Sequence, residues 1–235
     1  MNIVLSIPFT LNREEIKSQL AIPPGSRAEV SLEKILNHVQ KIAIPKAIYR
    51  VSYIEELNND SVTVEGAVFH SPALRLNLEE VHRIFPYIAT CGIEVGDTPI
   101  DQDDPIQAYW LRMIELALVR ISVEHVRKTI QELYRLETLS AMNPGSAEAG
   151  VWPLEEQRPL FSLFGGSQVV EGAIGVRLLP SCFMSPDMST SGILFPSNTA
   201  FFNCQLCQRE DCPSRKAPFD AALWETVQNS QRAGT

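Results

Sequence analysis

The sequence has few basic residues for its length and no long apolar run. Its 20 lysines and arginines are outnumbered by 28 aspartates and glutamates, so the formal net charge is -8. Nucleic-acid phosphates are bound by basic stripes, and this charge balance argues against DNA or RNA as a partner. No apolar segment approaches the roughly 20 residues that cross a bilayer, and the first residues lack the basic start of a signal peptide. We therefore expect a soluble, cytoplasmic protein with no nucleic-acid or membrane partner.

Cysteine is scarce, and its distribution argues against a disulfide framework. The count of five is odd, and three of the five thiols fall within nine positions, at Cys204, Cys207 and Cys212. Reduced thiols or metal ligands fit that spacing better than disulfides do. The sequence also lacks repeats and low-complexity stretches, while 45% of its residues are hydrophobic. We predict one domain over residues 1–235, with a cysteine-rich segment at about 200–218.

The spacing of apolar residues predicts several helices. A short helix is predicted after a cap at Asn12, and a second from a cap at Ser31 to about Ala43. The longest is predicted to begin at Asp103-Asp104-Pro105, where a carboxylate and a proline suit the first turn, and to end near Leu136. Two shorter helices are predicted, one through Val81 and Ile84 and one from Trp152 to about Gly165.

Alternating residues predict strands between these helices. Residues 49–53 and 62–66 alternate on either side of Asn58-Asn59-Asp60, which predicts a hairpin. Further strands are predicted at 87–93, 174–179 and 192–195, with a loop at 181–190 before the last one. Strands and helices in this order predict an α+β fold in which the strands share a sheet.

The clustered cysteines can supply metal ligands. Three thiolates and one further ligand suit a tetrahedral zinc or the iron of an iron–sulfur cluster. Cys182, in the neighbouring loop, is the first candidate for a fourth ligand, and Cys91 is the second. An iron–sulfur cluster would add a role in electron delivery, whereas zinc would make the segment a structural clasp. Free thiols are the third alternative, and the spacing alone leaves all three open.

One segment resembles a known family. Residues 179–193 contain Ser181, then Met184-Ser185-Pro186 and Ser189-Thr190-Ser191-Gly192. This order resembles the serine, methionine, proline and Ser-x-Ser-Gly pattern of the activation domain of cobalamin-dependent methionine synthase. Thr90-Cys91-Gly92, Pro144-Gly145 and Trp152-Pro153 follow the order of the same family. In particular, the chain resembles the stand-alone branch, which often carries a C-terminal cysteine cluster. The resemblance implies an α+β fold, a single domain with a twisted antiparallel sheet and flanking helices.

The resemblance implies an accessory role in methionine biosynthesis. Such a domain binds S-adenosylmethionine and docks on the cobalamin of a partner, a corrinoid-binding methyltransferase module. When the cobalt has been oxidised to inactive Co(II), an electron donor such as a flavodoxin or ferredoxin reduces it, and S-adenosylmethionine supplies the methyl group. The domain positions the methyl group and excludes water, so no catalytic side chain is expected. Whether the protein counts as an enzyme stays open.

The resemblance also implies particular contact residues. The positions that match the family, and are expected to contact S-adenosylmethionine or the corrinoid, are Pro144, Gly145, Ser189, Ser191 and Gly192. Phe202, or its neighbour Phe201, stands where the family has a ligand-contacting tyrosine. An arginine and a second tyrosine of the family are replaced by Ala141 and Ser146. These two replacements favour the alternative function, a corrinoid- or partner-docking module that no longer binds S-adenosylmethionine and uses its cysteine cluster for redox or structure.

Overall fold

The strand β6 (Arg83–Thr90) is the centre of the sheet, and its sequence explains that place. Every residue after Arg83 is buried. A strand that is apolar on both sides is stable only where both faces of the sheet are covered. β6 pairs antiparallel with β2 and β3 along one edge and with β10 along the other.

The computed structural model describes residues 1–235 except 102, 147–150, 199, 213–214 and 234–235. Within the described residues, eight strands form one antiparallel sheet in the order β1-β2-β6-β3-β4-β5, with β10 and then β7 added at the other edge of β6. Their bounds are Asn2–Ser6 (β1), Lys46–Arg50 (β2), Ser52–Leu57 (β3), Ser61–Val64 (β4), Ala67–His70 (β5), Leu139–Met142 (β7) and Ser189–Pro196 (β10). A separate ribbon pairs β8 (Arg177–Leu178) with β9 (Met184–Ser185).

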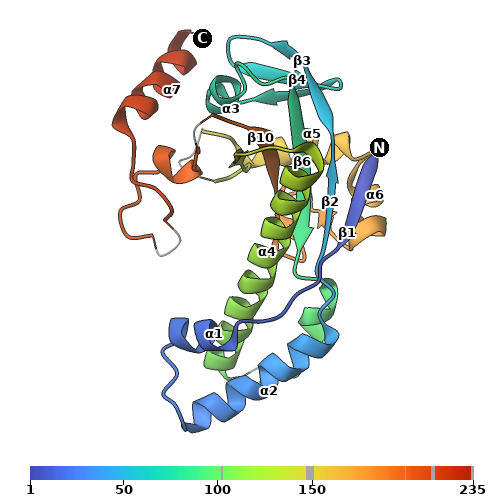
Figure 1. Ribbon diagram of the computed structural model, residues 1–235, viewed down its shortest axis with the longest axis vertical. Helices are drawn as coiled ribbons and strands as arrows, with labels where there is room; N and C mark the ends of the chain where they lie inside the picture. Colours follow the sequence, from blue (N-terminus) through green and yellow to red (C-terminus); the bar gives the residue numbers. More distant parts are fainter. Residues whose placement is uncertain (102, 147–150, 199, 213–214, 234–235) are drawn as a thin grey trace.

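Helices cover both faces of this sheet, as Figure 1 shows. The α-helices are α1 (Arg13–Gln19), α2 (Arg27–Ile42), α3 (Pro72–Asn77), α4 (Pro105–Tyr134), α5 (Gln157–Leu163), α6 (Ser167–Ile174) and α7 (Ala221–Ala233). Short 3-10 helices lie at Ile93–Asp97 (η1), Leu154–Glu156 (η2) and Asn203–Leu206 (η3). The predicted α+β fold, an antiparallel sheet with flanking helices, is confirmed. In the described part of the chain, no helix is long and apolar enough to span a membrane.

The helix α4 joins two parts of the core. Its first turn is capped by Asp104, whose Oδ1 accepts a hydrogen bond from the amide of Ile106 at 2.9 Å. Its second half packs Val126 and Ile130 on the sheet, in one cluster with Tyr87. Its first half continues past the sheet toward α1 and α2 (Figure 1), where its apolar residues form a second cluster with those of α2.

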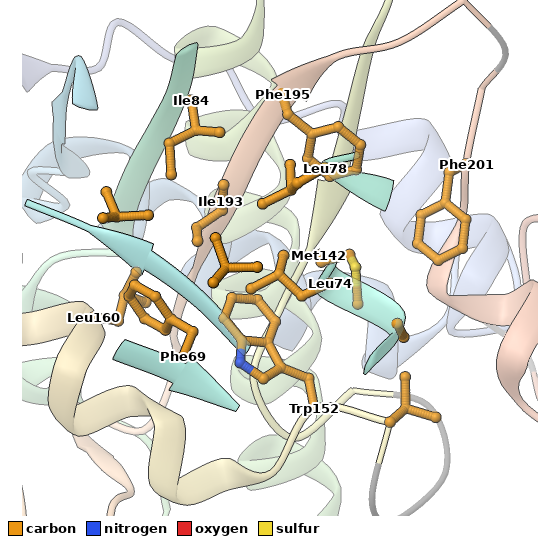
Figure 2. Close-up of a cluster of buried hydrophobic side chains, with 14 of the residues drawn as sticks. Phe69, Leu74, Leu78, Ile84, Met142, Trp152, Leu160, Ile193, Phe195 and Phe201 are labelled. Carbon is orange, nitrogen blue, oxygen red and sulfur yellow. The ribbon is translucent and has the colours of Figure 1, made fainter. Parts of the chain in front are cut away.

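The opposite face of the sheet is covered by α3, α5, α6 and α7. Phe161 and Phe164 pack against Ile88 of β6. A larger cluster surrounds Trp152, which is 1% exposed and meets Phe69 edge-to-face with 6.0 Å between the ring centroids (Figure 2). Trp152 lies shortly before α5, so its burial fixes the start of that helix against the sheet.

Several predicted boundaries are confirmed. Asn12 caps α1 by accepting a hydrogen bond from the amide of Glu15, and Asp104 begins the long helix. The predicted hairpin around Asn58-Asn59-Asp60 is confirmed as β3 and β4, in which Leu57 lies opposite Val62. Its first strand begins at Ser52 rather than Tyr49, because Tyr49 belongs to β2 and pairs with Tyr87 of β6.

Other predicted boundaries are wrong by about a turn or more. The second helix is capped by Ser26 rather than Ser31, because Ser26 Oγ accepts from the amide of Glu29 at 3.1 Å and helical residues follow at once. No helix passes through Val81 and Ile84: α3 ends at Asn77, and Ile84 pairs with Ser52 in the sheet. The strand predicted at 174–179 is reduced to β8, since α6 occupies the chain as far as Ile174.

We expect Trp152→Ala to destabilise the fold by about 3–5 kcal/mol, because it leaves a large cavity beside Phe69. Denaturant unfolding followed by circular dichroism measures this loss. Tyr53→Ala is the control, since Tyr53 is 58% exposed and its removal should cost about 1 kcal/mol or less. Equal losses in the two variants would contradict the anchoring role of Trp152.

Candidate functional site

A pocket of about 530 Å³ lies where α4, β7 and the C-terminal segment meet. Within the described residues β7 pairs only with β10, so its other edge is free to face the pocket. Arg127 of α4, Ala141 of β7 and Phe202 contribute to the lining. The pocket therefore brings together residues up to 89 positions apart, from Arg127 to Lys216. It includes the three positions at which the sequence departs from the resembled family, Ala141, Ser146 and Phe202.

Asn143 connects three structural elements beside this pocket. Its Nδ2 donates hydrogen bonds to the hydroxyl oxygen of Tyr87 at 2.8 Å and to the carbonyl oxygen of Ser191 at 2.6 Å. Its Oδ1 accepts from Nδ2 of Asn203 at 3.1 Å. One amide side chain thus holds β6, β10 and η3 together at the end of β7. Burial raises the pKa of Tyr87, so its hydroxyl stays protonated and its oxygen accepts from Asn143 as a neutral group.

Gly192 makes that arrangement of Asn143 feasible. A Cβ at position 192 would lie 2.4 Å from the carbonyl oxygen of Met142 and 2.5 Å from Nδ2 of Asn143. Both distances are far below van der Waals contact, so only glycine leaves room for the amide to lie across β10. Gly192 was predicted to contact the ligand or the corrinoid, but it is not among the residues that line this pocket. The structure gives a packing reason for glycine at this position, which is the close approach of Asn143.

The two serines of the Ser-x-Ser-Gly segment do not line the pocket. Ser191 is buried, and its hydroxyl donates to Oε1 of Gln157 in α5 at 2.8 Å. The Oγ atom of Ser189 is also buried and has no hydrogen-bond partner among the described residues. Ser191 thus ties β10 to α5, while Ser189 retains an unused hydroxyl next to the end of β6, where it lies opposite Thr90.

The Pro144-Gly145 turn follows β7 and borders the pocket. Gly145 has φ +76°, a backbone conformation that favours glycine, and its amide donates to the carbonyl oxygen of Trp152 at 2.8 Å. A Cβ on Gly145 would lie 2.9 Å from Leu154 Cδ1. Asn143 and Ser146, on either side of the turn, line the pocket, whereas Pro144 and Gly145 shape the backbone between them.

The cysteine-rich segment closes one side of the pocket. Cys204, Cys207 and Cys212 are half-buried free thiols, and all three line the pocket. Cys182 lies elsewhere: it is buried in the turn between β8 and β9 and is not part of the lining. Among the residues that the structure describes, no three histidine, cysteine, aspartate or glutamate side chains are grouped as metal ligands. The thiols as placed do not fit zinc or an iron–sulfur cluster, and we derive no chemistry from such a group.

Arg215 holds the cysteine-rich segment in its folded shape. Its guanidinium donates to the carbonyl oxygens of Cys204 at 3.2 Å, Cys207 at 3.0 Å and Ala217 at 3.1 Å, and also to that of Arg209. Each bond to a charged donor is stronger than a neutral one. A single side chain thus joins the backbone at both ends of this loop.

A second arginine attaches the motif loop, residues 184–188, which lead from β9 to β10, to α4. Both terminal nitrogens of Arg112 donate to the carboxylate of Asp187, at 2.9 and 2.6 Å, and the same guanidinium reaches Glu115 at 3.2 Å. The Arg112 charge lowers the pKa of Asp187, whereas burial raises that of Glu115. The Met184–Asp187 part of the chain is thereby fixed to the same helix that carries Arg127.

We expect Gly192→Ala to destabilise the protein by about 1–3 kcal/mol, because the new methyl group forces Asn143 out of its position. Gly172→Ala is the matched control. Gly172 lies on the exposed side of α6 with open space around it, so alanine should stabilise by about 0.5–1 kcal/mol. Thermal unfolding of both variants measures the difference. A Gly192→Ala protein as stable as the parent would refute the close approach.

We expect three thiols to react with Ellman's reagent in the native protein and two more after unfolding. The fast thiols are Cys204, Cys207 and Cys212. Cys182 is buried, and burial raises the pKa of Cys91 to about 12, so its reactive thiolate is almost absent at neutral pH. Cys207→Ser should lower the native count by one. Fewer than three reactive thiols in the parent would indicate a bound metal or a disulfide, which metal analysis would distinguish.

Comparison with known proteins connects the fold to one domain. No family model matches this chain, and no curated protein matches it in sequence. Among solved structures, it is similar to the crystal structure of the MetH reactivation domain bound to AdoHcy, with a TM-score of 0.58 and 14% identity. The alignment covers 97% of this chain and 89% of that one. The chain therefore has, over nearly its whole length, the fold of the MetH reactivation domain.

Proposed function

We propose that this protein binds S-adenosylmethionine and supports the reductive remethylation of the corrinoid of a cobalamin-dependent methyltransferase, such as methionine synthase. The observation that carries the proposal is the fold shared with a reactivation domain that holds AdoHcy, S-adenosylhomocysteine. S-adenosylhomocysteine is what remains of S-adenosylmethionine after its methyl group has been transferred. The likeness extends over 97% of this chain.

The pocket beside β7 is the proposed ligand site. Its volume of about 530 Å³ falls within the range of small-molecule sites, roughly 300–1,000 Å³. The resembled family contacts its ligand through three positions that Ala141, Ser146 and Phe202 occupy in this chain. All three line the pocket. Phe202 is 38% exposed, so its ring has a free surface on which an adenine can stack. Asn143 adds a polar group whose position is fixed by its three hydrogen bonds.

The proposed reaction needs positioning rather than a nucleophile. The partner brings the corrinoid, a flavodoxin or ferredoxin supplies the electron that reduces it, and the ligand's sulfonium donates the methyl group. The residues of this chain then have two tasks, to hold the sulfonium where the partner's corrinoid can reach it and to exclude water. A rigid wall made of α4, β7 and the Asn143 bonds suits the first task, because bound geometry is worth several kcal/mol of barrier.

The alternative function is docking on a corrinoid protein without S-adenosylmethionine. It is favoured by Ala141, whose methyl group offers no hydrogen bond to the pocket, and by Ser146, which has no ring. In that case the cysteine-rich segment would serve structure or redox chemistry. The bonds from Arg215 to its carbonyl oxygens support the structural role, because they close the loop with the guanidinium in place of a metal.

We expect calorimetric titration with S-adenosylhomocysteine to give saturable one-to-one binding, and Phe202→Ala to weaken it about tenfold through lost stacking. Phe183→Ala is the control, since Phe183 is 62% exposed and outside the pocket. Iron and zinc are measured on the same sample, so that a lost metal is not mistaken for absent binding. If a folded parent protein shows no heat of binding, the docking function replaces the proposal.

A further inference from the structure

The charged side chains that line the pocket beside β7 indicate which end of the proposed S-adenosyl ligand binds to them. Among the described residues that line it, three are charged: Arg127, Glu137 and Lys216. Arg127 belongs to α4, the longest helix, while Glu137 and Lys216 lie outside the helices and strands. A group on a rigid helix is the better anchor, because binding then costs little ordering of the site.

The guanidinium of Arg127 reaches from α4 to β7 and has a donor to spare. Its Nη1 donates to the carbonyl oxygen of Leu139, which fixes the direction of the side chain. Its Nε lies 3.9 Å from the carboxylate of Glu124, too far for a hydrogen bond. Nη2 has no hydrogen-bond partner among the residues that the structure describes. The side chain is 27% exposed, so this nitrogen remains within reach of a ligand.

Ala141 leaves the space that such a contact needs. In β7, Leu139 and Ala141 share one side of the strand and pack in the same cluster as Val126, the neighbour of Arg127 on α4. The side chain at position 141 therefore points toward the face where Arg127 lies. Burial raises the pKa of Tyr87, and both the hydrogen bond from Asn143 and the charge of Arg127 oppose that rise. Arg127 and Asn143 thus act on the same hydroxyl.

We propose that Arg127 binds the α-carboxylate of the amino-acid end of an S-adenosyl ligand, which rests on the proposed function. A guanidinium held by one bond and free at another nitrogen is suited to a carboxylate, and such charge-assisted bonds are the strong ones. The small side chain of Ala141 gives the carboxylate access, and Glu137 in the same pocket offers the opposite charge to the ligand's ammonium group. The adenosine part of the ligand is uncharged and needs neither Arg127 nor Glu137.

Two ligands separate this contact from the rest of the site. S-adenosylhomocysteine carries the amino-acid group, whereas 5′-methylthioadenosine keeps the adenosine and thioether but lacks that group. We expect Arg127→Gln to raise the Kd of S-adenosylhomocysteine about 10- to 100-fold and to leave that of methylthioadenosine unchanged. Arg127→Lys should fall between the parent and the glutamine variant, because lysine keeps the charge but loses the planar pair of donors.

Lys128→Gln is the matched control, since it removes the same charge from the next residue of α4, whose side chain is 66% exposed. A parent protein that binds neither ligand would overturn the proposed function and this inference together. A parent that binds S-adenosylhomocysteine while Arg127→Gln binds it equally well would overturn only the inference. Equal weakening of both ligands, with a lowered thermal midpoint, would make Arg127 a structural brace between α4 and β7 and would also refute the carboxylate contact.

Discussion

The close approach of Asn143 to Gly192 is the constraint on which the site depends. The amide of Asn143 occupies the space that a side chain at position 192 would fill, and from there it bonds to β6, β10 and η3. Among the described residues, this amide is a polar link from the end of β7 to β6, in addition to the ladder of β7 with β10. The walls of the pocket are fixed because Gly192 of β10 leaves space for the side chain of Asn143, the residue that follows β7.

The helix α4 holds two other segments of the chain in place. Arg112 holds the motif loop through Asp187, and Arg127 holds β7 through the carbonyl oxygen of Leu139. The two arginines are 15 residues apart, which corresponds to about 22 Å along a helix that rises 1.5 Å per residue. The helix itself is buried against the sheet over its second half, so the two attachments keep a constant separation. The proposed function, which positions a methyl donor relative to a partner, would use such a fixed separation.

The sequence predicted elements whose signals are local. Asn12 and Asp104 cap helices because a short polar side chain precedes an apolar repeat, and the hairpin of β3 and β4 follows from alternation around a polar turn. The prediction failed where two signals compete, as at Ile84, whose apolar neighbours fit a helix but whose pairing with Ser52 decides for a strand. Asn143 was missed because an asparagine before Pro-Gly indicates a turn, and its bonds to Tyr87 and Asn203 are visible only in three dimensions.

The cysteine-rich segment shows how the same spacing can serve different structures. The spacing of the thiols at positions 204, 207 and 212 left a metal site or free thiols open. In the fold they line one pocket, while Cys182 is buried in another turn. What a metal does for such a loop is to join distant backbone points through one charged centre. Arg215 does the same with carbonyl oxygens as partners, and its donors satisfy groups that the loop leaves without ladder bonds. The three thiols then remain free and line the pocket beside β7.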